Sequence, residues 1–225
     1  MVFKFFKNLK KYSKGVTLIE IMVVLFLIAL FGSMVIVNFP NIERQSALSR
    51  STYKLAQDLR KVQDMGLSGL KTTYNDGTTV RASGYGIYVD LYSAVNNKIP
   101  ANQQYTIYAD SCPPSAPPSA PDHKYNLLGS YDAYCNYDSN ADNGGDHIID
   151  TINVDPDNSG VYIQGFKYSI DGNHTSINFS PPNPDINIEN LDSHYNAVEI
   201  VLGLKSDPGT TRSVTVNKSG LIDVQ

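Results

Sequence analysis

The sequence predicts an α+β fold in which a long N-terminal helix packs on an antiparallel β-sheet domain. Three observations support this prediction. A run that is apolar apart from Gly32 and Ser33 covers residues 21–37, and an amphipathic helical pattern follows it. Short Tyr-, Val- and Ile-rich runs, separated by turn residues, occupy the rest of the chain. We therefore expect one helix with two chemically different halves, followed by a single domain of strands.

The N-terminal region combines a basic leader with an apolar segment of membrane length. Residues 1–15 contain five lysines and no acidic residue, and residues 21–37 contain no charged residue. As a helix, this run would rise roughly 25 Å, and its apolar flanks extend it to match a hydrocarbon core of ~30 Å. We expect residues 16–39 to span a membrane with the lysines on the cytoplasmic side.

Residues 40–70 predict a continuation of the helix with one apolar face. This face carries residues spaced three or four positions apart, namely Leu48, Thr52, Leu55, Leu59 and Val62. Charged residues, Asp58 among them, are expected to cover the remaining surface. Gly66 and Gly69 are the predicted stop signals. Because only one side of this half needs a cover, a β-sheet of the following domain is its expected partner.

Residues 71–225 predict a β-rich domain outside the cytoplasm. The expected strands cover residues 85–92, 104–109, 147–154, 160–170, 175–180, 197–204, 212–217 and 221–224. Turn residues separate several of them, at Asp76-Gly77, Asp171-Gly172-Asn173 and Asp207-Pro208-Gly209.

The junction of the leader and the apolar run reads Lys14-Gly15-Val16-Thr17-Leu18-Ile19-Glu20. A charged side chain at the bilayer centre costs roughly 2.5–3.5 kcal/mol on insertion scales, so a carboxylate at Glu20 implies a partner. This pattern resembles the prepilins of type IV pili and type II secretion pseudopili. The G-x-T-L-I-E core matches residue for residue, whereas Val16 stands where the family most often has Phe.

The resemblance implies roles for three residues. In that family a prepilin peptidase cuts after the glycine, here Gly15, and the new N-terminus, here Val16, is N-methylated. The glutamate, here Glu20, meets the N-terminal amine of a neighbouring subunit during filament assembly. The implied partners are other pilin subunits, the prepilin peptidase and methyltransferase, the inner-membrane assembly platform and the membrane itself. Residues 1–15 would be the cleaved leader, and residues 16–39 would enter the filament core in a pilin fold.

Two other classes of N-terminal segment fit less well. A secretory signal peptide has a small-residue cleavage site after its apolar core, but here Asn38-Phe39-Pro40-Asn41 follows the run. A plain membrane anchor would need neither Gly15 before the span nor Glu20 in its first turns. Within the prepilin family, the chain is most similar to the GspH/FimT-type minor pseudopilins, through residues 55–63, 84–88 and 212–222.

Charge argues against nucleic acid as a partner. The intact chain has a formal net charge of −4, and removing the leader leaves 13 Lys and Arg against 22 Asp and Glu, or −9. DNA binding needs clusters of Lys or Arg, and none is evident outside the leader. The four histidines stand apart in sequence, and no catalytic motif accompanies them. We therefore expect no enzymatic activity.

An insertion near residues 111–160 carries a predicted disulfide and a predicted calcium loop. Outside the cytoplasm Cys112 and Cys135 would form a disulfide, which in the chain-entropy model stabilises the folded state by roughly 3 kcal/mol. Free thiols are the alternative. The candidate ligands of a structural Ca²⁺ are Asp138, Asn140, Asp142, Asp146 and Asp150. Their spacing resembles a D-x-[DN]-x-[DN]-G loop, but the glycine comes one residue late and no Glu closes it. An acidic loop without metal is the alternative.

A second and weaker match to that calcium pattern is Asp155-x-Asp157-x-Ser159-Gly160.

The overall prediction is a structural subunit, and a minor one, of a type IV pilus or type II secretion pseudopilus. It would be a single-pass inner-membrane protein before assembly and an extracytoplasmic or cell-surface filament afterwards. The alternatives are a filament-tip binding module that contacts a surface, a secreted protein or DNA, and a membrane-anchored domain that never polymerises.

Overall fold

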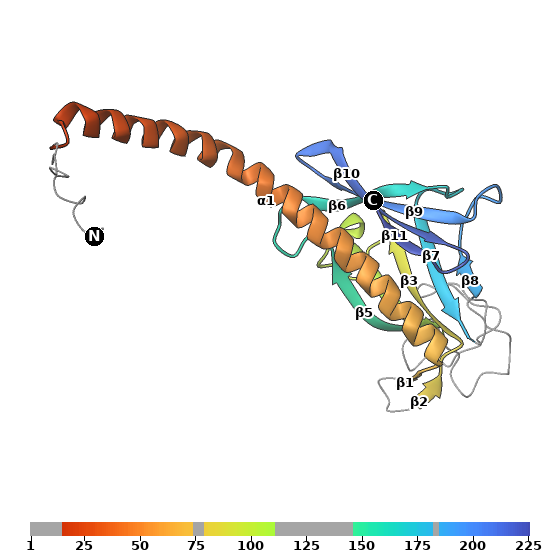
Figure 1. Cartoon of the computed structure of the whole chain (residues 1–225). Coiled ribbons are helices and arrows are strands. Elements are labelled where there is room, and N and C mark those ends of the chain that lie inside the picture. Colours follow the sequence, from red (N-terminus) through yellow and green to blue (C-terminus); the bar gives the residue numbers. More distant parts are fainter. Residues whose placement is uncertain (1–14, 74–78, 111–145, 182–184) are drawn as a thin grey trace, which may run out of the picture. The chain divides into compact units, whose positions relative to one another are not determined.

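The computed structural model describes residues 15–73, 79–110, 146–181 and 185–225. The chain divides into two units, Met1–Ile42 and Glu43–Gln225. One long helix, α1 (Leu18–Ser68), contributes to both units, and every strand belongs to the second (Figure 1). The predicted α+β arrangement, a long N-terminal apolar helix followed by antiparallel sheets, is confirmed.

The C-terminal half of α1 is amphipathic, as the residue spacing predicts. Its buried residues include all five of the predicted apolar face, together with Ala47 and Ala56. Thr52 lies on this face because its hydroxyl donates a hydrogen bond to the Leu48 carbonyl oxygen at 2.7 Å. The expectation that Asp58 faces solvent is wrong, since its residue surface is only 9% exposed.

Helix α1 ends at Ser68, and Gly69 is the residue that stops it. Gly69 has a φ of 58°, the left-handed conformation that commonly follows the last helical residue. The prediction that Gly66 is also a stop is wrong, because Gly66 lies inside the helix. A Cβ atom at Gly66 would overlap the main-chain carbonyl oxygen of Phe179. This glycine is therefore required by the close approach of the helix to a strand.

The larger sheet has five antiparallel strands in the order β5-β4-β3-β7-β8. The strands are β3 (Gly84–Asp90), β4 (Gln104–Asp110), β5 (His147–Asn153), β7 (His174–Ser180) and β8 (Asp185–Ile188). A 3-10 helix, η1 (Ala101–Gln103), precedes β4. On the central strand, Ile87 lies between Ile107 of β4 and Ile177 of β7, and all three side chains are buried.

The smaller sheet has four antiparallel strands in the order β11-β10-β9-β6. The strands are β6 (Val161–Lys167), β9 (Ala197–Leu204), β10 (Asp207–Asn217) and β11 (Ile222–Val224). Alternate residues of β9, from Val198 to Leu204, are buried with the core, as expected for a sheet that covers a helix. Separately, β1 (Lys71–Thr73) and β2 (Thr79–Arg81) pair with each other.

Each of the eight predicted strand regions contains a strand, but β1, β2 and β8 were not predicted. These three strands have only three or four residues each, too few to display an alternating pattern. The predicted turn at Asp207-Pro208-Gly209 is wrong, because Asp207 already pairs with Leu204 and begins β10. Its carboxylate accepts hydrogen bonds from the Gly209 amide and the Thr210 hydroxyl, so these residues form a bulge in the strand.

Helix α1 and both sheets share one hydrophobic core. Leu55 and Leu59 of the helix pack in the same cluster as Ile177 of the larger sheet and Ile200 of the smaller one. The cluster belongs to the second unit, so the covering of the amphipathic helix half is confirmed.

Polar contacts fasten the same half of α1 to both sheets. The Tyr105 hydroxyl of β4 donates a short hydrogen bond to the buried Asp58 carboxylate, which also pairs with Lys54 at 3.1 Å. Toward the other sheet, Gln63 Nε2 donates to the Gly220 carbonyl oxygen at 3.1 Å. Because hydrogen bonds are directional, these contacts fix the rotation of the helix about its own axis, in addition to the apolar packing.

The larger sheet also carries a buried polar cluster beside the core. The Tyr108 hydroxyl lies 2.6 Å from the Ser176 hydroxyl and accepts a hydrogen bond from Asn178 Nδ2 at 3.3 Å. Tyr108 reaches these residues of β7 across Gly86 of β3, where a Cβ atom would overlap the phenol ring. Burial raises the pKa of Tyr108 well above its usual range, so this phenol stays protonated.

Candidate functional site

The helix that carries the predicted processing motif begins immediately after it. Thr17 precedes the first residue of α1, and its side-chain Oγ1 accepts a hydrogen bond from the Glu20 amide at 3.3 Å. The Thr17 carbonyl oxygen also accepts from the Ile21 amide at 3.3 Å. Thr17 is thus the N-cap of the helix, and Glu20 occupies the third helical position. The order Thr-x-x-Glu is that of a capping box, a sequence signal that marks the start of a helix.

Glu20 lies in the first helical turn, where unsatisfied amides and the helix dipole favour a negative charge. Its side chain is exposed, and within the described residues its carboxylate has neither a hydrogen bond nor an ion pair. The fold therefore orients this carboxylate but does not neutralise it. Gly15 lies ahead of the N-cap, and no atom outside its chain neighbours comes within 4 Å of the position of a Cβ there.

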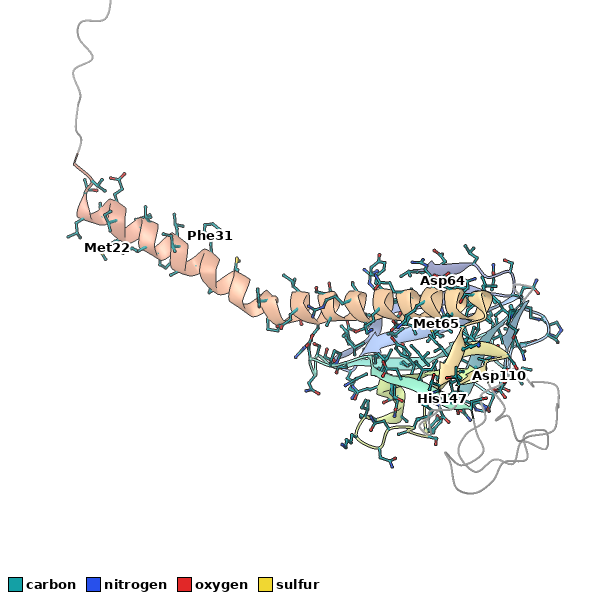
Figure 2. All side chains as sticks on the ribbon, turned by 90° about the horizontal axis from the view of Figure 1, so that it is seen from below. Met22, Phe31, Asp64, Met65, Asp110 and His147 are labelled. Atoms are coloured by element: carbon teal, nitrogen blue, oxygen red, sulfur yellow. The ribbon has the colours of Figure 1, made fainter. Side chains whose placement is uncertain are left out.

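The helix presents apolar side chains on all sides along this segment. The exposed large apolar residues include Val16, Leu18, Ile19, 21–28, Leu30, Phe31 and Met34. Figure 2 shows Met22 and Phe31 projecting from the ribbon without neighbours. Among the described residues, α1 is the one helix long and apolar enough to cross a membrane, judged by length and composition. Such a surface requires a cover of lipid or of other apolar helices.

Comparison with known protein families matches residues 10–36 to a family described as the prokaryotic N-terminal methylation motif. The chain carries the signal of type IV pilins and pseudopilins. The motif spans the leader junction, the cap at Thr17, Glu20 and most of the exposed apolar helix. No curated protein and no solved structure matches the chain.

The methylation motif supports a type IV pilin or pseudopilin subunit. In general terms it implies assembly with other pilins and processing by a prepilin peptidase. Together with the apolar helix, it fits a membrane-anchored precursor that later forms a surface filament. The motif is that of a structural protein and is not catalytic.

The predicted calcium and disulfide residues fall largely outside the described part of the chain. Asp138, Asn140, Asp142, Cys112 and Cys135 all lie outside the described residues. Asp146 directly precedes β5, and Asp150 lies on it. Among the residues that the structure describes, no group of three or more His, Cys, Asp or Glu side chains converges as a metal site requires.

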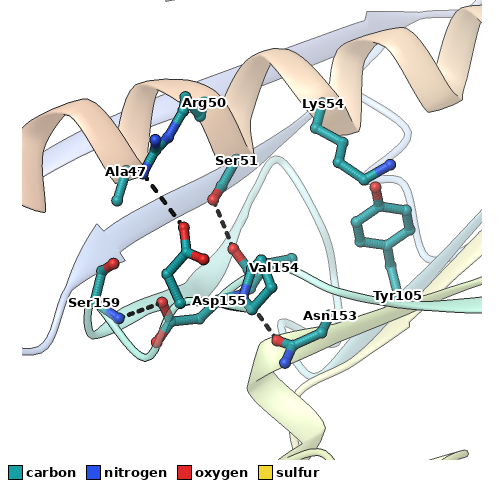
Figure 3. Close-up of a pocket in the computed structure, with 11 residues that line it drawn as sticks. Ala47, Arg50, Ser51, Lys54, Tyr105, Asn153, Val154, Asp155 and Ser159 are labelled. Atoms are coloured by element: carbon teal, nitrogen blue, oxygen red, sulfur yellow. Dashed lines mark hydrogen bonds and ion pairs between the residues drawn. The ribbon is translucent and has the colours of Figure 1, made fainter.

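The second segment that resembles a calcium loop, residues 155–160, is a turn stabilised by its own hydrogen bonds. The Asp155 carboxylate accepts from the Ser159 amide at 2.7 Å and from the Gly160 amide at 2.9 Å. Gln103 Nε2 also donates to it, at 3.3 Å. The Asp157 carboxylate instead pairs with Arg50 of α1 at 3.4 Å. Both residues line a hollow of about 230 Å³ between the helix and this turn (Figure 3). The two carboxylates therefore serve different contacts and do not form one ligand set.

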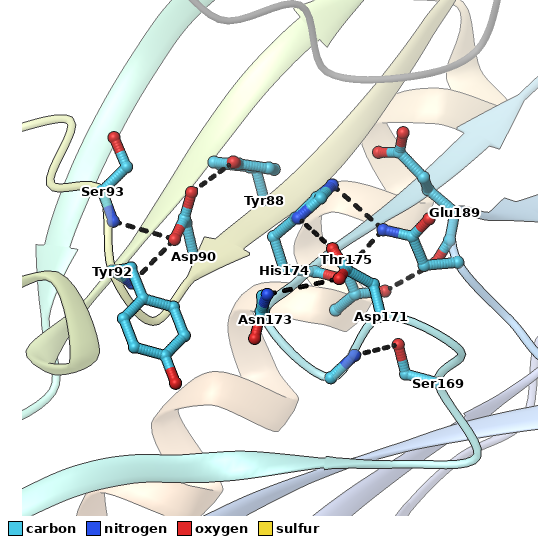
Figure 4. Close-up of polar contacts among 12 residues, drawn as sticks. Tyr88, Asp90, Tyr92, Ser93, Ser169, Asp171, Asn173, His174, Thr175 and Glu189 are labelled. Atoms are coloured by element: carbon cyan, nitrogen blue, oxygen red, sulfur yellow. Dashed lines mark hydrogen bonds and ion pairs between the residues drawn. The ribbon is translucent and has the colours of Figure 1, made fainter.

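Histidine and acidic side chains meet at one end of the larger sheet, where their contacts are structural (Figure 4). Asn190 Nδ2 donates to the His174 carbonyl oxygen at 3.2 Å, and the same amide nitrogen faces His174 Nε2 at 3.0 Å. Nε2 must then accept, and Nδ1 donates to Asp171 at 2.9 Å. Nearby, the Asp90 carboxylate accepts from the Tyr88 hydroxyl and from two amides of the following turn.

Proposed function

We propose that this protein is a subunit of a type IV pilus or type II secretion pseudopilus, made as a precursor and cleaved after Gly15. Val16 would then be the methylated N-terminus. Residues 1–15 are the leader, residues 16–39 the membrane and filament-core segment, residues 40–70 the amphipathic helix and residues 71–225 the extracytoplasmic domain. The observation that carries the proposal is a capped apolar helix, exposed from Leu18 to Met34, that coincides with the methylation motif.

The proposed assembly step follows from the charge at the helix start. Cleavage after Gly15 creates an amine at Val16, directly before the N-cap. This amine and the Glu20 carboxylate are both unfavourable in an apolar surrounding, and opposite charges from two copies neutralise each other there. Copies would therefore stack with the amine of one helix at Glu20 of its neighbour, while apolar side chains replace lipid around both.

A minor role, similar to that of the GspH/FimT-type pseudopilins, is also part of this proposal. It is supported by the loosely matching segments 55–63, 84–88 and 212–222. Before assembly the protein would be a single-pass inner-membrane protein with its N-terminus in the cytoplasm. The abundance of the protein in filaments, relative to a major subunit, tests the minor role.

The deciding experiment is intact-mass spectrometry on sheared filaments and on membranes from the same cells. A mass that starts at Val16 and includes one methyl group, found in filaments, is the expected result. A full-length mass confined to membranes would refute the proposal. Replacing Gly15 with Leu should retain the full-length mass, because the peptidase needs a small residue before the cut.

The role of Glu20 is tested by Glu20→Gln, which keeps the side-chain shape and removes the charge. We expect normal cleavage of this variant but strongly reduced recovery in filaments. Glu43→Gln is the matched control, since Glu43 is an exposed acid of the same helix outside the apolar segment. Equal incorporation of the Glu20 variant and the control would contradict the proposed pairing.

A further inference from the structure

Charge is distributed unevenly between the helix and the strands of the second unit. Residues 43–68 contain five Lys and Arg and three Asp and Glu, for a net charge of +2. Residues 69–225 contain eight Lys and Arg and eighteen Asp and Glu, for a net charge of −10. An acidic β domain therefore carries its basic surface on α1.

The basic residues of α1 form a stripe on the face that the sheets leave uncovered. This basic stripe consists of Arg50, Tyr53, Lys54, Arg60 and Lys61, all exposed and spaced along one side of the helix. Figure 2 shows Asp64 leaving the helix on the open side and Met65 leaving it toward the strands. The basic stripe therefore shares the uncovered side of α1 with the acidic Asp64.

Contacts within the subunit occupy two cations of the basic stripe, since Lys54 pairs with the buried Asp58 at 3.1 Å and Arg50 pairs with Asp157, and they leave Lys61 available to a partner. Arg50 and Asp157 form an exposed pair at 3.4 Å, and such surface pairs contribute little to stability. Among the residues that the structure describes, Arg60 donates only to the Ile222 carbonyl oxygen, at 3.3 Å. Within the described residues Lys61 has no hydrogen bond or ion pair, and Tyr53 is 53% exposed.

A second surface, on different elements, has the opposite character. We name it the acidic knob, and it consists of Tyr168, Ile170, Asp171, Asp192 and Tyr195. Its residues come from the connections between β6 and β7 and between β8 and β9. The Tyr168 and Tyr195 rings contact each other at a centroid distance of 4.4 Å with their planes tilted by 35°, and Ile170 is 73% exposed. Apolar groups and carboxylates are thus displayed together.

The acidic knob is held in a fixed and partly strained shape. Tyr168 has a φ of 67°, a conformation that a bulky residue adopts at an energetic cost. Two backbone hydrogen bonds join the connections, from the Ile170 amide to Asn190 and from the Asp192 amide to Tyr168. Hydrogen bonds from His194, chiefly from its backbone amide, lower the pKa of Asp192. The Asp192 carboxylate therefore remains charged at neutral pH.

We propose that the acidic knob of one subunit docks on the basic stripe of the next subunit in the filament. This inference rests on the proposed function, because it assumes that copies are stacked. Charge complementarity favours a second copy of this chain as the occupant, since both complementary surfaces are present on every copy. It also offsets the repulsion that domains of charge −10 would experience when crowded along one filament.

The geometry of such a contact explains how it would repeat. The stripe and the knob are different surfaces, so the contact is heterologous, and each subunit keeps one free surface after docking. A heterologous contact that does not close into a ring generates an open helical filament. The paired tyrosines and Ile170 would cover Tyr53 and the aliphatic parts of Lys61 and Arg60, while the carboxylates meet the cations.

Cysteine cross-linking of the full-length protein in cells tests this contact. The variant Lys61→Cys/Ile170→Cys should give a ladder of disulfide-linked oligomers in sheared filaments. Each single variant is a control, and Lys61→Cys/Asp223→Cys, which pairs the stripe with an exposed residue of β11, is the matched double control. A ladder specific to the first variant supports the docking, and dimers alone would contradict a heterologous contact.

Charge exchange gives an independent readout that needs no cross-link. Lys61→Glu and Ile170→Lys should each lower filament yield several-fold, because each places like charges together. The combination Lys61→Glu/Ile170→Lys should restore the yield, and both side chains are exposed, so the fold tolerates the changes. If wild-type filaments form, but the double-cysteine variant gives no ladder and the charge variants do not change the filament yield, the docking alone is overturned. Absence of wild-type filaments would overturn the proposed function and the docking together.

Discussion

At the scale of single residues, Asp58 of α1 and Tyr105 of β4 form a buried polar contact. A buried carboxylate is unfavourable unless it is paired and hydrogen-bonded, and here Tyr105 and Lys54 satisfy it. The pKa of Tyr105 is raised above its usual range, mainly by burial and to a lesser extent by the hydrogen bond to Asp58. The Tyr105 phenol therefore stays protonated across the neutral range and remains a hydrogen-bond donor to Asp58.

This contact predicts a steep loss of stability in alkali. A tyrosine whose folded pKa is raised contributes stability that is fully present below about pH 10 and lost as the pH rises beyond that value. Tyr85, Tyr105 and Tyr108 all have raised pKa values, burial being the largest cause in each case. Each of them can steepen the loss of stability by up to about 1.4 kcal/mol per pH unit.

Replacing Tyr105 with Phe isolates one of these contributions. We expect the free energy of unfolding to fall by about 1.5–3 kcal/mol near pH 8, since a hydrogen bond to a charged group is lost. Above about pH 10 the variant should lose stability less steeply than the wild type. Denaturant titration of the full chain in detergent measures both quantities. Tyr92→Phe, at a highly exposed ring, is the control, and parallel alkaline slopes for all three proteins would contradict this account.

At the scale of elements, the close contact between α1 and β7 explains a glycine that helix propensity alone would disfavour. Glycine is roughly 1 kcal/mol worse than alanine in a helix interior. At Gly66 the missing Cβ allows the helix to approach Phe179, whose own Cβ would lie only 2.9 Å from a Cβ placed there. Packing against a rigid strand therefore overrides local preference at this position.

The expected result of Gly66→Ala is a loss of stability despite the better helix former. Overpacking a rigid contact costs typically 1–3 kcal/mol, which exceeds the gain in propensity. The thermal unfolding midpoint of the full chain in detergent is the measurement. Gln57→Ala, on the exposed face of α1, should leave the midpoint nearly unchanged. An unchanged or higher midpoint for Gly66→Ala would show that the helix end can move away from β7.

At the scale of the whole molecule, the two units differ in whether their apolar side chains are exposed to solvent or buried. The first unit exposes its apolar helix, and none of its described residues belongs to the core, whereas the described core of α1 and both sheets lies in the second unit. Burial of apolar surface is the main stabilising effect in folding, so the second unit should be stable without the first. The first unit should be the cause of any need for lipid or detergent.

Deletion of residues 1–42 tests this division. We expect the remaining chain to be soluble without detergent and to unfold cooperatively near the midpoint of the full-length protein. The near-ultraviolet circular dichroism of the buried tyrosines reports whether the core is intact. Aggregation of the shortened chain, or loss of that signal, would mean that the first unit contributes to the fold.

The sequence alone determined the features that depend on local periodicity and on a contiguous motif. The apolar run, the buried stripe from Leu48 to Val62 and the strand regions could be predicted, because side-chain spacing reports which face is buried. The candidate site at Gly15, Val16 and Glu20 could also be identified, since its residues are adjacent in the chain. Its functional roles remain predictions, as do the calcium ligands and the disulfide.

Only the tertiary structure decided which residues act through distant partners. Asp58 is buried because Tyr105, far along the chain, supplies its hydrogen bond, and Gly66 is needed because Phe179 lies beside it. Asp207 begins a strand because its carboxylate organises a bulge opposite β9. The acidic knob likewise joins two connections separated by two strands. Such contacts depend on how sheets and helix meet in space, and local sequence patterns carry no information about that arrangement.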